Sequence, residues 1–153
     1  MAIANVKLRD ELHAQSIRDP LTGLYNRRFF LDTMRRLLIG AGRQKQTFSR
    51  VSFDADTFKL FNDNHGHDAG DVVLQAISEK LLDVVPGDAI DCRMGGEEFA
   101  VILPDCMLKS AQGIANQMRE VIADTQVQYV HGTLPKITIS AGVSSFPQHG
   151  KTP

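Results

Sequence analysis

The sequence predicts a single α+β domain built on an antiparallel sheet. From Val51 onward, the apolar periodicity alternates in the order strand, helix, strand, strand, helix, strand. This is the order of the ferredoxin-like βαββαβ core, in which helices pack on one side of an antiparallel sheet. The chain has 153 residues, of which 42% are hydrophobic, so its length and composition suit one domain with a substantial core.

Two helices are predicted before this core. Residues 1–17 interleave charged and apolar side chains, with Leu8 and Leu12 four positions apart, which predicts an amphipathic helix that would serve as a stalk. A second helix is predicted from Asn26 to Gly42. We therefore divide the chain into a stalk and a domain over residues 18–153.

The first core strand begins at Phe48, where the apolar period changes to two. Its apolar side chains lie on one face, and its polar side chains, which include Asp54 and Asp56 at its end, lie on the other. A short helical turn is predicted over residues 57–61. A longer helix follows the next loop and extends from Asp68 to a stop at Pro86.

A β-hairpin is predicted around the tip at residues 95–98, which read Gly-Gly-Glu-Glu. Pairing Met94 with Phe99 would place Cys92 opposite Val101 and give the hairpin one apolar face.

The last two core elements are a helix over residues 107–123 and a strand. The strand is predicted from the alternation of Ile137, Ile139, Ala141 and Val143. Together with the hairpin they complete the βαββαβ order.

Charge and composition exclude several classes of function. The formal net charge is −1, which provides no general field for binding nucleic acid or an anionic membrane. No apolar stretch approaches the ~20 residues that span a bilayer, and no secretory signal is visible, so a cytoplasmic location is expected.

The hairpin register separates Cys92 from Cys106 beyond disulfide reach, so both thiols are expected to be free.

Four carboxylates are expected to meet at one end of the sheet. With the first and second strands side by side, the strand end with Asp54 and Asp56 meets the tip with Glu97 and Glu98. Like charges gathered without basic partners disfavour one another, so such a cluster indicates a missing cation. Oxygen ligands suit Mg²⁺ or Mn²⁺, which complete their coordination with water and phosphate oxygens, so a nucleotide is the expected partner.

A plainer interpretation of these acids stays open from the residues alone. Asp56 would cap the next helical turn, and Glu97 and Glu98 would simply be solvated at the hairpin tip. Gly95 and Gly96 weigh against it, because they make a tip whose backbone a ligand can approach closely.

Three motifs resemble those of one known family. Residues 93–99 read RMGGEEF, residues 19–27 read DPLTGLYNR, and residues 54–59 and 62–71 read DADTFK and NDNHGHDAGD. In their order along the chain, these motifs are similar to those of the GGDEF family, the diguanylate cyclases, in its GGEEF form. The resemblance covers residues 19–147 and implies the palm-like fold of nucleotide cyclases.

The resemblance also implies roles for individual residues. It implies that the divalent metals are held by Asp54, the backbone carbonyl of Ala55, Glu97 and, as a weaker candidate, Glu98. It implies that the substrate is bound by Asn62, Asp71, Lys59, His67, Gly95 and Gly96. Glu97 would also accept a proton, and Lys59 would neutralise phosphate, so both are expected to be catalytic. The base would be read by Asn62 and Asp71, because the Asp71 carboxylate can accept from guanine N1 and N2 and the Asn62 amide can both donate and accept.

Plainer roles remain for three of these residues. Asp71 lies near the start of a predicted helix, where an acid is favourable to the helix dipole. Lys59 could be a solvated surface lysine, and His67 could be a hydrogen-bonding residue of the loop.

The reaction implied by the resemblance joins two GTP molecules into cyclic di-GMP and releases pyrophosphate, with two Mg²⁺ or Mn²⁺ ions. Because one domain holds one GTP, turnover would need a homodimer with two-fold symmetry, set by an upstream sensor domain. The alternative is a regulatory module that binds GTP or cyclic di-GMP without turnover.

The sequence departs from the family's pattern in two regions. Many members carry an Arg-x-x-Asp pair that forms an inhibitory product site, but Pro86 and Ala89 occupy those positions here, so no inhibitory site is expected. Thr57 and Met94 also replace bulkier rings. Family domains continue past the last strand into a helix, so the chain is expected to be truncated before it.

Overall fold

The computed structural model describes residues 16–44 and 46–147. The helices are α2 (Arg27–Gln44), α3 (Phe58–His65), α4 (His67–Val84) and α5 (Leu108–Ala123). The strands are β1 (Phe48–Ala55), β2 (Ile90–Gly95), β3 (Glu98–Pro104), β4 (Gln128–Tyr129), β5 (Gly132–Thr133) and β6 (Ile139–Phe146). Apart from Ser16 and Ile17, the predicted stalk helix lies outside the described residues.

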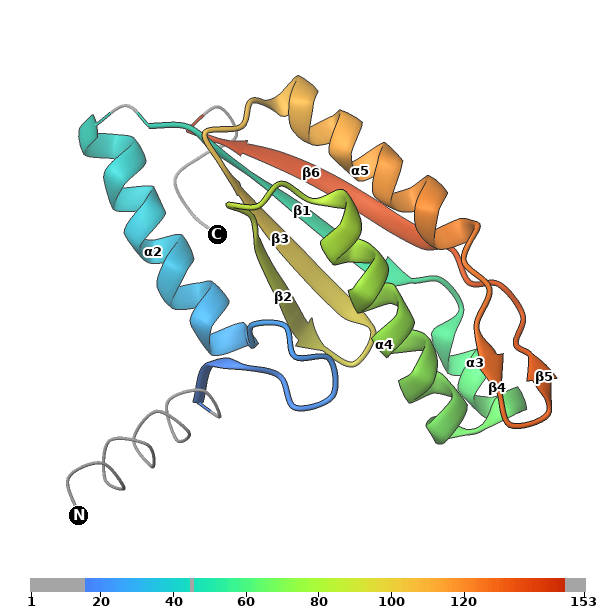
Figure 1. Ribbon diagram of the computed structural model, residues 1–153. Coiled ribbons are helices and arrows are strands. Elements are labelled where there is room, and N and C mark those ends of the chain that lie inside the picture. The colour runs from blue at the N-terminus through green and yellow to red at the C-terminus, as the bar shows by residue number, and fades with distance from the viewer. Residues whose placement is uncertain (1–15, 45, 148–153) are drawn as a thin grey trace, which may run out of the picture.

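A four-stranded antiparallel sheet in the order β2-β3-β1-β6 forms the centre of the domain (Figure 1). β1 lies in the middle and pairs with β3 and β6. β1 and β2 run in the same direction, are connected through α3 and α4, and have β3 between them, which is the split βαβ arrangement. The predicted α+β, ferredoxin-like fold is therefore confirmed.

The prediction that β1 lies beside the first strand of the hairpin is wrong. The neighbour of β1 is β3, the second strand of the hairpin. The crossover through α4 returns the chain two strand positions away from β1, and the hairpin turn then brings β3 into the gap. The end of β1 still meets the hairpin tip, because Asp54 pairs with Glu98.

The predicted hairpin register is also wrong by one residue. Arg93 pairs with Phe99 and Cys92 pairs with Ala100, whereas Gly95 pairs with Glu98. The register shifts between Arg93 and Gly95, which is a β-bulge that leaves Met94 as the extra residue. A count of residues from the tip cannot reveal such an insertion.

Helices cover both faces of the sheet, not one. The face covered by α4 and α5 holds the main core, to which β1 contributes Val51, Phe53 and Ala55 as predicted. On the other face, α2 packs Phe30 and Met34 against the sheet (Figure 1). The helix predicted from Asn26 is thus the cover for the second face.

The connection between β1 and α4 is more helical than predicted. α3 continues to His65, and Gly66 alone separates it from α4, where a short turn and a six-residue loop were expected. The Gly66 N–H donates to the Asn62 carbonyl at 2.7 Å, so the helical hydrogen bonding continues past the predicted end at residue 61. Gly66 has φ 90°, a conformation that permits the sharp change of direction between the helices.

The structure also describes the two cysteines, the faces of β6 and the apolar content of the helices. Cys92 and Cys106 are both free, as expected. In β6, which is an edge strand of the sheet formed by the described residues, Ile139 is buried but Ala141 is exposed, so the predicted alternation holds only in part. No helix within the described residues is long and apolar enough to cross a membrane.

Candidate active site

The end of β1 and the tip of the β2–β3 hairpin form the candidate site. Asp54 lies directly opposite Glu98 in the strand register. The next backbone group, the Ala55 N–H, donates to the Glu97 carbonyl at 3.2 Å. Cross-strand partners have Cβ atoms about 4.5–5.5 Å apart, so the backbones of the four residues predicted to bind metal lie next to one another.

The chemistry of these groups fits a divalent cation. In the part of the chain that the structure describes, no three His, Cys, Asp or Glu side chains already converge as a metal site. Asp54 and Glu98 are nevertheless exposed carboxylates on facing strands, and none of the ion pairs found among the described residues includes them. Oxygen donors of this kind suit Mg²⁺ or Mn²⁺, with the remaining ligands supplied by water or phosphate.

Asp56 does not belong to this cluster, contrary to prediction. Its carboxylate accepts hydrogen bonds from the Thr138 hydroxyl at 2.7 Å and from the Ser140 hydroxyl at 2.5 Å. These bonds, the one from Ser140 first, lower the pKa of Asp56. Asp56 is not a helix cap either, because Thr57 is the N-cap of α3. It links the end of β1 to the segment that enters β6.

The hairpin tip is held by Arg93, which the sequence analysis did not single out. Its Nε and Nη2 donate to the Gly96 carbonyl at 3.0 and 2.9 Å. Its Nη1 lies 3.2 Å from an Asp19 carboxylate oxygen. One guanidinium therefore joins the turn at Asp19 to the residue that precedes Glu97. The sequence offered one clue to this bridge, because Asp19 begins the motif at residues 19–27 and Arg93 begins the motif at residues 93–99.

Asp19 is fixed in turn by its own loop. Its carboxylate accepts from the Thr22 N–H and hydroxyl, each at 2.8 Å. Partial burial raises the pKa of Asp19, but the hydrogen bonds from Thr22 and Arg93 outweigh it and leave that pKa lowered. The carboxylate is thus held in its charged form beside Arg93.

The residues predicted to read the base lie on α3 and α4. Asn62 on α3 is half-buried, and its Oδ1 is buried without a hydrogen-bond partner among the described residues. Asp71 and His67 lie on α4 and are exposed, as is Lys59 on α3. The short connection through Gly66 places the two helices side by side next to the end of β1 (Figure 1).

Two arginines near the carboxylates were also missed. A hollow of about 230 Å³ reaches Asp54 and Glu98 from the α2 side of the sheet, and Arg27 and Arg50 line it. Arg50 and Asp54 lie on the same, polar face of β1 and are separated on that face by Ser52. The alternation of the strand therefore already indicated that Arg50 lies near Asp54.

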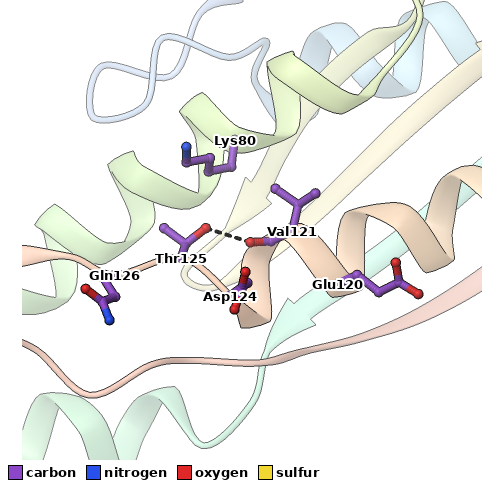
Figure 2. A pocket seen from close by; sticks show the side chains of 6 residues that line it. All are labelled: Lys80, Glu120, Val121, Asp124, Thr125 and Gln126. Atoms are coloured by element: carbon purple, nitrogen blue, oxygen red, sulfur yellow. Dashed lines mark hydrogen bonds between the residues drawn. The ribbon is translucent and has the colours of Figure 1, made fainter.

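A separate depression of about 430 Å³ lies between α4 and α5 (Figure 2). Lys80 of α4 borders it on one side, and Glu120 and Asp124 border it on the other. The Thr125 hydroxyl donates to the Val121 carbonyl at 2.7 Å within it. None of the residues predicted to be functional lines this depression. The candidate site is therefore placed at the carboxylates of β1 and the hairpin tip, because of their chemistry, and not at this hollow.

Comparison with known proteins identifies the family. Residues 16–153 match the family model described as "Diguanylate cyclase, GGDEF domain". The chain therefore belongs to the GGDEF family, whose activity is the synthesis of cyclic di-GMP.

Individual relatives agree with this assignment. The response regulator PleD of Caulobacter vibrioides is 38% identical over 139 residues, which cover 90% of this chain and 31% of PleD. A diguanylate cyclase of Vibrio cholerae is 37% identical over 147 residues, which cover 95% of this chain and 44% of that protein. The chain thus spans less than half the length of these relatives.

A solved structure has the same fold. The coiled coil and GGDEF domain of DgcB from Caulobacter crescentus, in complex with c-di-GMP, matches with a TM-score of 0.87 and 27% identity. The match covers 98% of this chain and 82% of that one.

Proposed function

We propose that this chain is a catalytic domain that condenses two GTP molecules into cyclic di-GMP and pyrophosphate. The observation that supports this most is the pairing of Asp54 with Glu98, next to the hydrogen bond between Ala55 and Glu97. A domain that only bound a nucleotide through its base would not need facing carboxylates at this point.

In this proposal, the base and the phosphates are bound by different elements. Asn62 and Asp71 accept from the N–H groups of the guanine edge. Lys59, one helical turn before Asn62, offsets phosphate charge. Arg27 and Arg50 line the hollow beside Asp54 and are further cations available to the terminal phosphates.

The chemical step takes place at the hairpin tip. Glu97 accepts the proton of the 3′-hydroxyl that attacks the α-phosphorus of the facing GTP. Gly95 and Gly96 keep the tip free of side chains, so the phosphates can approach its backbone. Two Mg²⁺ or Mn²⁺ ions, held by Asp54, the Ala55 carbonyl and Glu97 with help from Glu98, would lower the pKa of the hydroxyl and stabilise charge on the leaving oxygens.

Glu97→Gln tests this assignment. The substitution removes a carboxylate at an exposed turn and leaves the core intact, so we expect an unchanged thermal melt and loss of turnover. The assay incubates the protein with GTP and MgCl₂ and separates the nucleotides by chromatography.

Glu79→Gln is the matched control, because Glu79 is an exposed residue of α4 outside the site. Activity of Glu97→Gln within about tenfold of the parent, a barrier change of only ~1.4 kcal/mol, would contradict the role of Glu97. GTP binding without product from the unaltered protein would instead support the non-catalytic alternative.

A further inference from the structure

Gly70 on α4 lies against the side chain of Asn62 on α3. A Cβ atom at Gly70 would lie 1.9 Å from Asn62 Oδ1 and 2.9 Å from its Cγ. It would also lie 3.0 Å from Cζ of Phe58. Both distances to Asn62 are shorter than non-bonded atoms tolerate, so Asn62 can keep its place only if residue 70 has no side chain.

The backbone of Gly70 gives no other reason for glycine. Gly70 lies within α4, and it is not among the glycines with positive φ. Glycine inside a helix is unfavourable relative to alanine, because it loses more conformational freedom on folding. A packing reason is therefore needed, and the contact with Asn62 supplies one.

The backbone of Asn62 is fixed, and a buried ring lies near its contact with Gly70. Its main-chain carbonyl accepts from the Gly66 N–H at 2.7 Å, which fixes the C-terminal turn of α3. Phe58, one turn earlier on α3, is buried and closes the other side of the contact. The position that a Cβ atom would take at Gly70 is thus bordered by both the Asn62 amide and this ring.

The Oδ1 atom in this position is buried and accepts no hydrogen bond from the described residues. A buried acceptor without a donor is unfavourable, so an N–H group that donated to Asn62 Oδ1 would stabilise this arrangement. Guanine presents N–H donors at N1 and N2, whereas adenine presents an acceptor at N1. Asp71, the residue after Gly70 on α4, is exposed and carries a second acceptor.

We propose that Gly70 is a positioning residue for base selection, because its lack of a side chain keeps the Asn62 amide where it can accept from guanine. This inference rests on the proposed function, since it takes GTP as the nucleotide. It adds a position on α4 that acts through Asn62 and has no side chain of its own to offer the base.

The experiment compares Gly70→Ala with Gly113→Ala. Gly113 lies within α5, and no atom lies within 4 Å of the Cβ that alanine would add there, so it is a matched helical control. Kd values for GTP and ATP are measured by calorimetry in the presence of Mg²⁺. We expect Gly70→Ala to weaken GTP binding at least tenfold and to leave ATP binding unchanged, so that the preference for GTP collapses. Gly113→Ala should keep the parent preference.

A double-mutant cycle tests the contact without any nucleotide. Gly70→Ala should lower Tm when Asn62 is present, and it should lower Tm much less in an Asn62→Ala background, where Oδ1 and Cγ are absent. The remaining 3.0 Å approach to Phe58 needs only a small shift of that ring. Equal losses of Tm in the two backgrounds would overturn the inference.

The nucleotide data separate two kinds of failure. A parent that prefers GTP, together with a Gly70→Ala variant of the same preference, would refute the inference alone. Equal weakening of GTP and ATP by Gly70→Ala would also refute it, since that is the result of general damage. A parent that binds neither nucleotide would refute the proposed function and base selection together.

Discussion

Asp91 is a buried acid that lowers the stability of the folded state at neutral pH. It lies in β2 opposite Val101, and only 7% of its surface is exposed. Its Oδ1 has no hydrogen-bond partner among the described residues. Burial raises the pKa of Asp91 to about 6, so at neutral pH a charged carboxylate is held in a poorly solvated place.

Asp91→Asn should therefore stabilise the protein at pH 7. Because the pKa of Asp91 is higher in the folded than in the unfolded state, the stability of the parent is lost as pH rises from about 4 to about 6. The advantage of the variant should grow over this interval by up to about 3 kcal/mol and stay constant above it. Denaturant unfolding at several pH values measures it.

Asp83→Asn is the control for this prediction, since Asp83 is exposed on α4. It should show little change across the same interval. A stability difference between the parent and Asp91→Asn that does not vary with pH would contradict the raised pKa.

Pro86 and Ala89 are the basis of a prediction about inhibition by product. Neither can provide the guanidinium or the carboxylate of an Arg-x-x-Asp site, and Ala89 N–H donates to the Pro86 carbonyl at 3.0 Å in a tight turn. We expect cyclic di-GMP to inhibit only by competition with GTP. Steady-state rates at several GTP concentrations measure this, and potent non-competitive inhibition would refute it.

At the scale of elements, the hairpin tip depends on its link to the turn before α2. Arg93 donates to Gly96 and to Asp19 at the same time, which requires the planar, forked guanidinium. The β2–β3 hairpin is thus fixed at both ends, by the sheet and by this bridge. The position of Glu97 relative to β1 depends on both.

Arg93→Lys should lower kcat at least tenfold while the domain stays folded. An ammonium is a compact charge that cannot reproduce the three donors of this bridge, so the tip gains freedom. Loss of such bonds costs roughly 1.5–3 kcal/mol each, which a thermal melt should detect. Arg36→Lys on the exposed side of α2 is the control, and equal kcat values for both variants would contradict the role of Arg93.

At the scale of the whole molecule, one domain has one set of facing carboxylates and one pair of helices, α3 and α4, beside them. The product of the proposed reaction contains two nucleotides, so we expect two domains to face each other, which a two-fold axis satisfies. Specific activity should therefore rise with protein concentration at low concentration. The measurement is product formed per unit of protein, with light scattering at the same concentrations. Constant specific activity from a species shown to be a monomer would refute the dimer.

Much of this molecule was predictable from its sequence. Alternation in β1 assigned Val51, Phe53 and Ala55 to the main core and Asp54 to the opposite face, because side-chain direction in a strand depends only on parity. The Gly-Gly-Glu-Glu tip predicted the hairpin, and the order of elements predicted the ferredoxin-like sheet. These are local properties, which short stretches of sequence specify.

Only the tertiary structure decided the contacts between distant segments. The bulge at Met94, the pairing of β1 with β3, and the bonds of Asp56 to Thr138 and Ser140 all join residues far apart in sequence or depend on strand register. The same is true of Arg93 and Asp19, which are 74 positions apart. Such contacts are chosen by packing and by hydrogen-bond satisfaction over the whole chain, and periodicity carries no information about either.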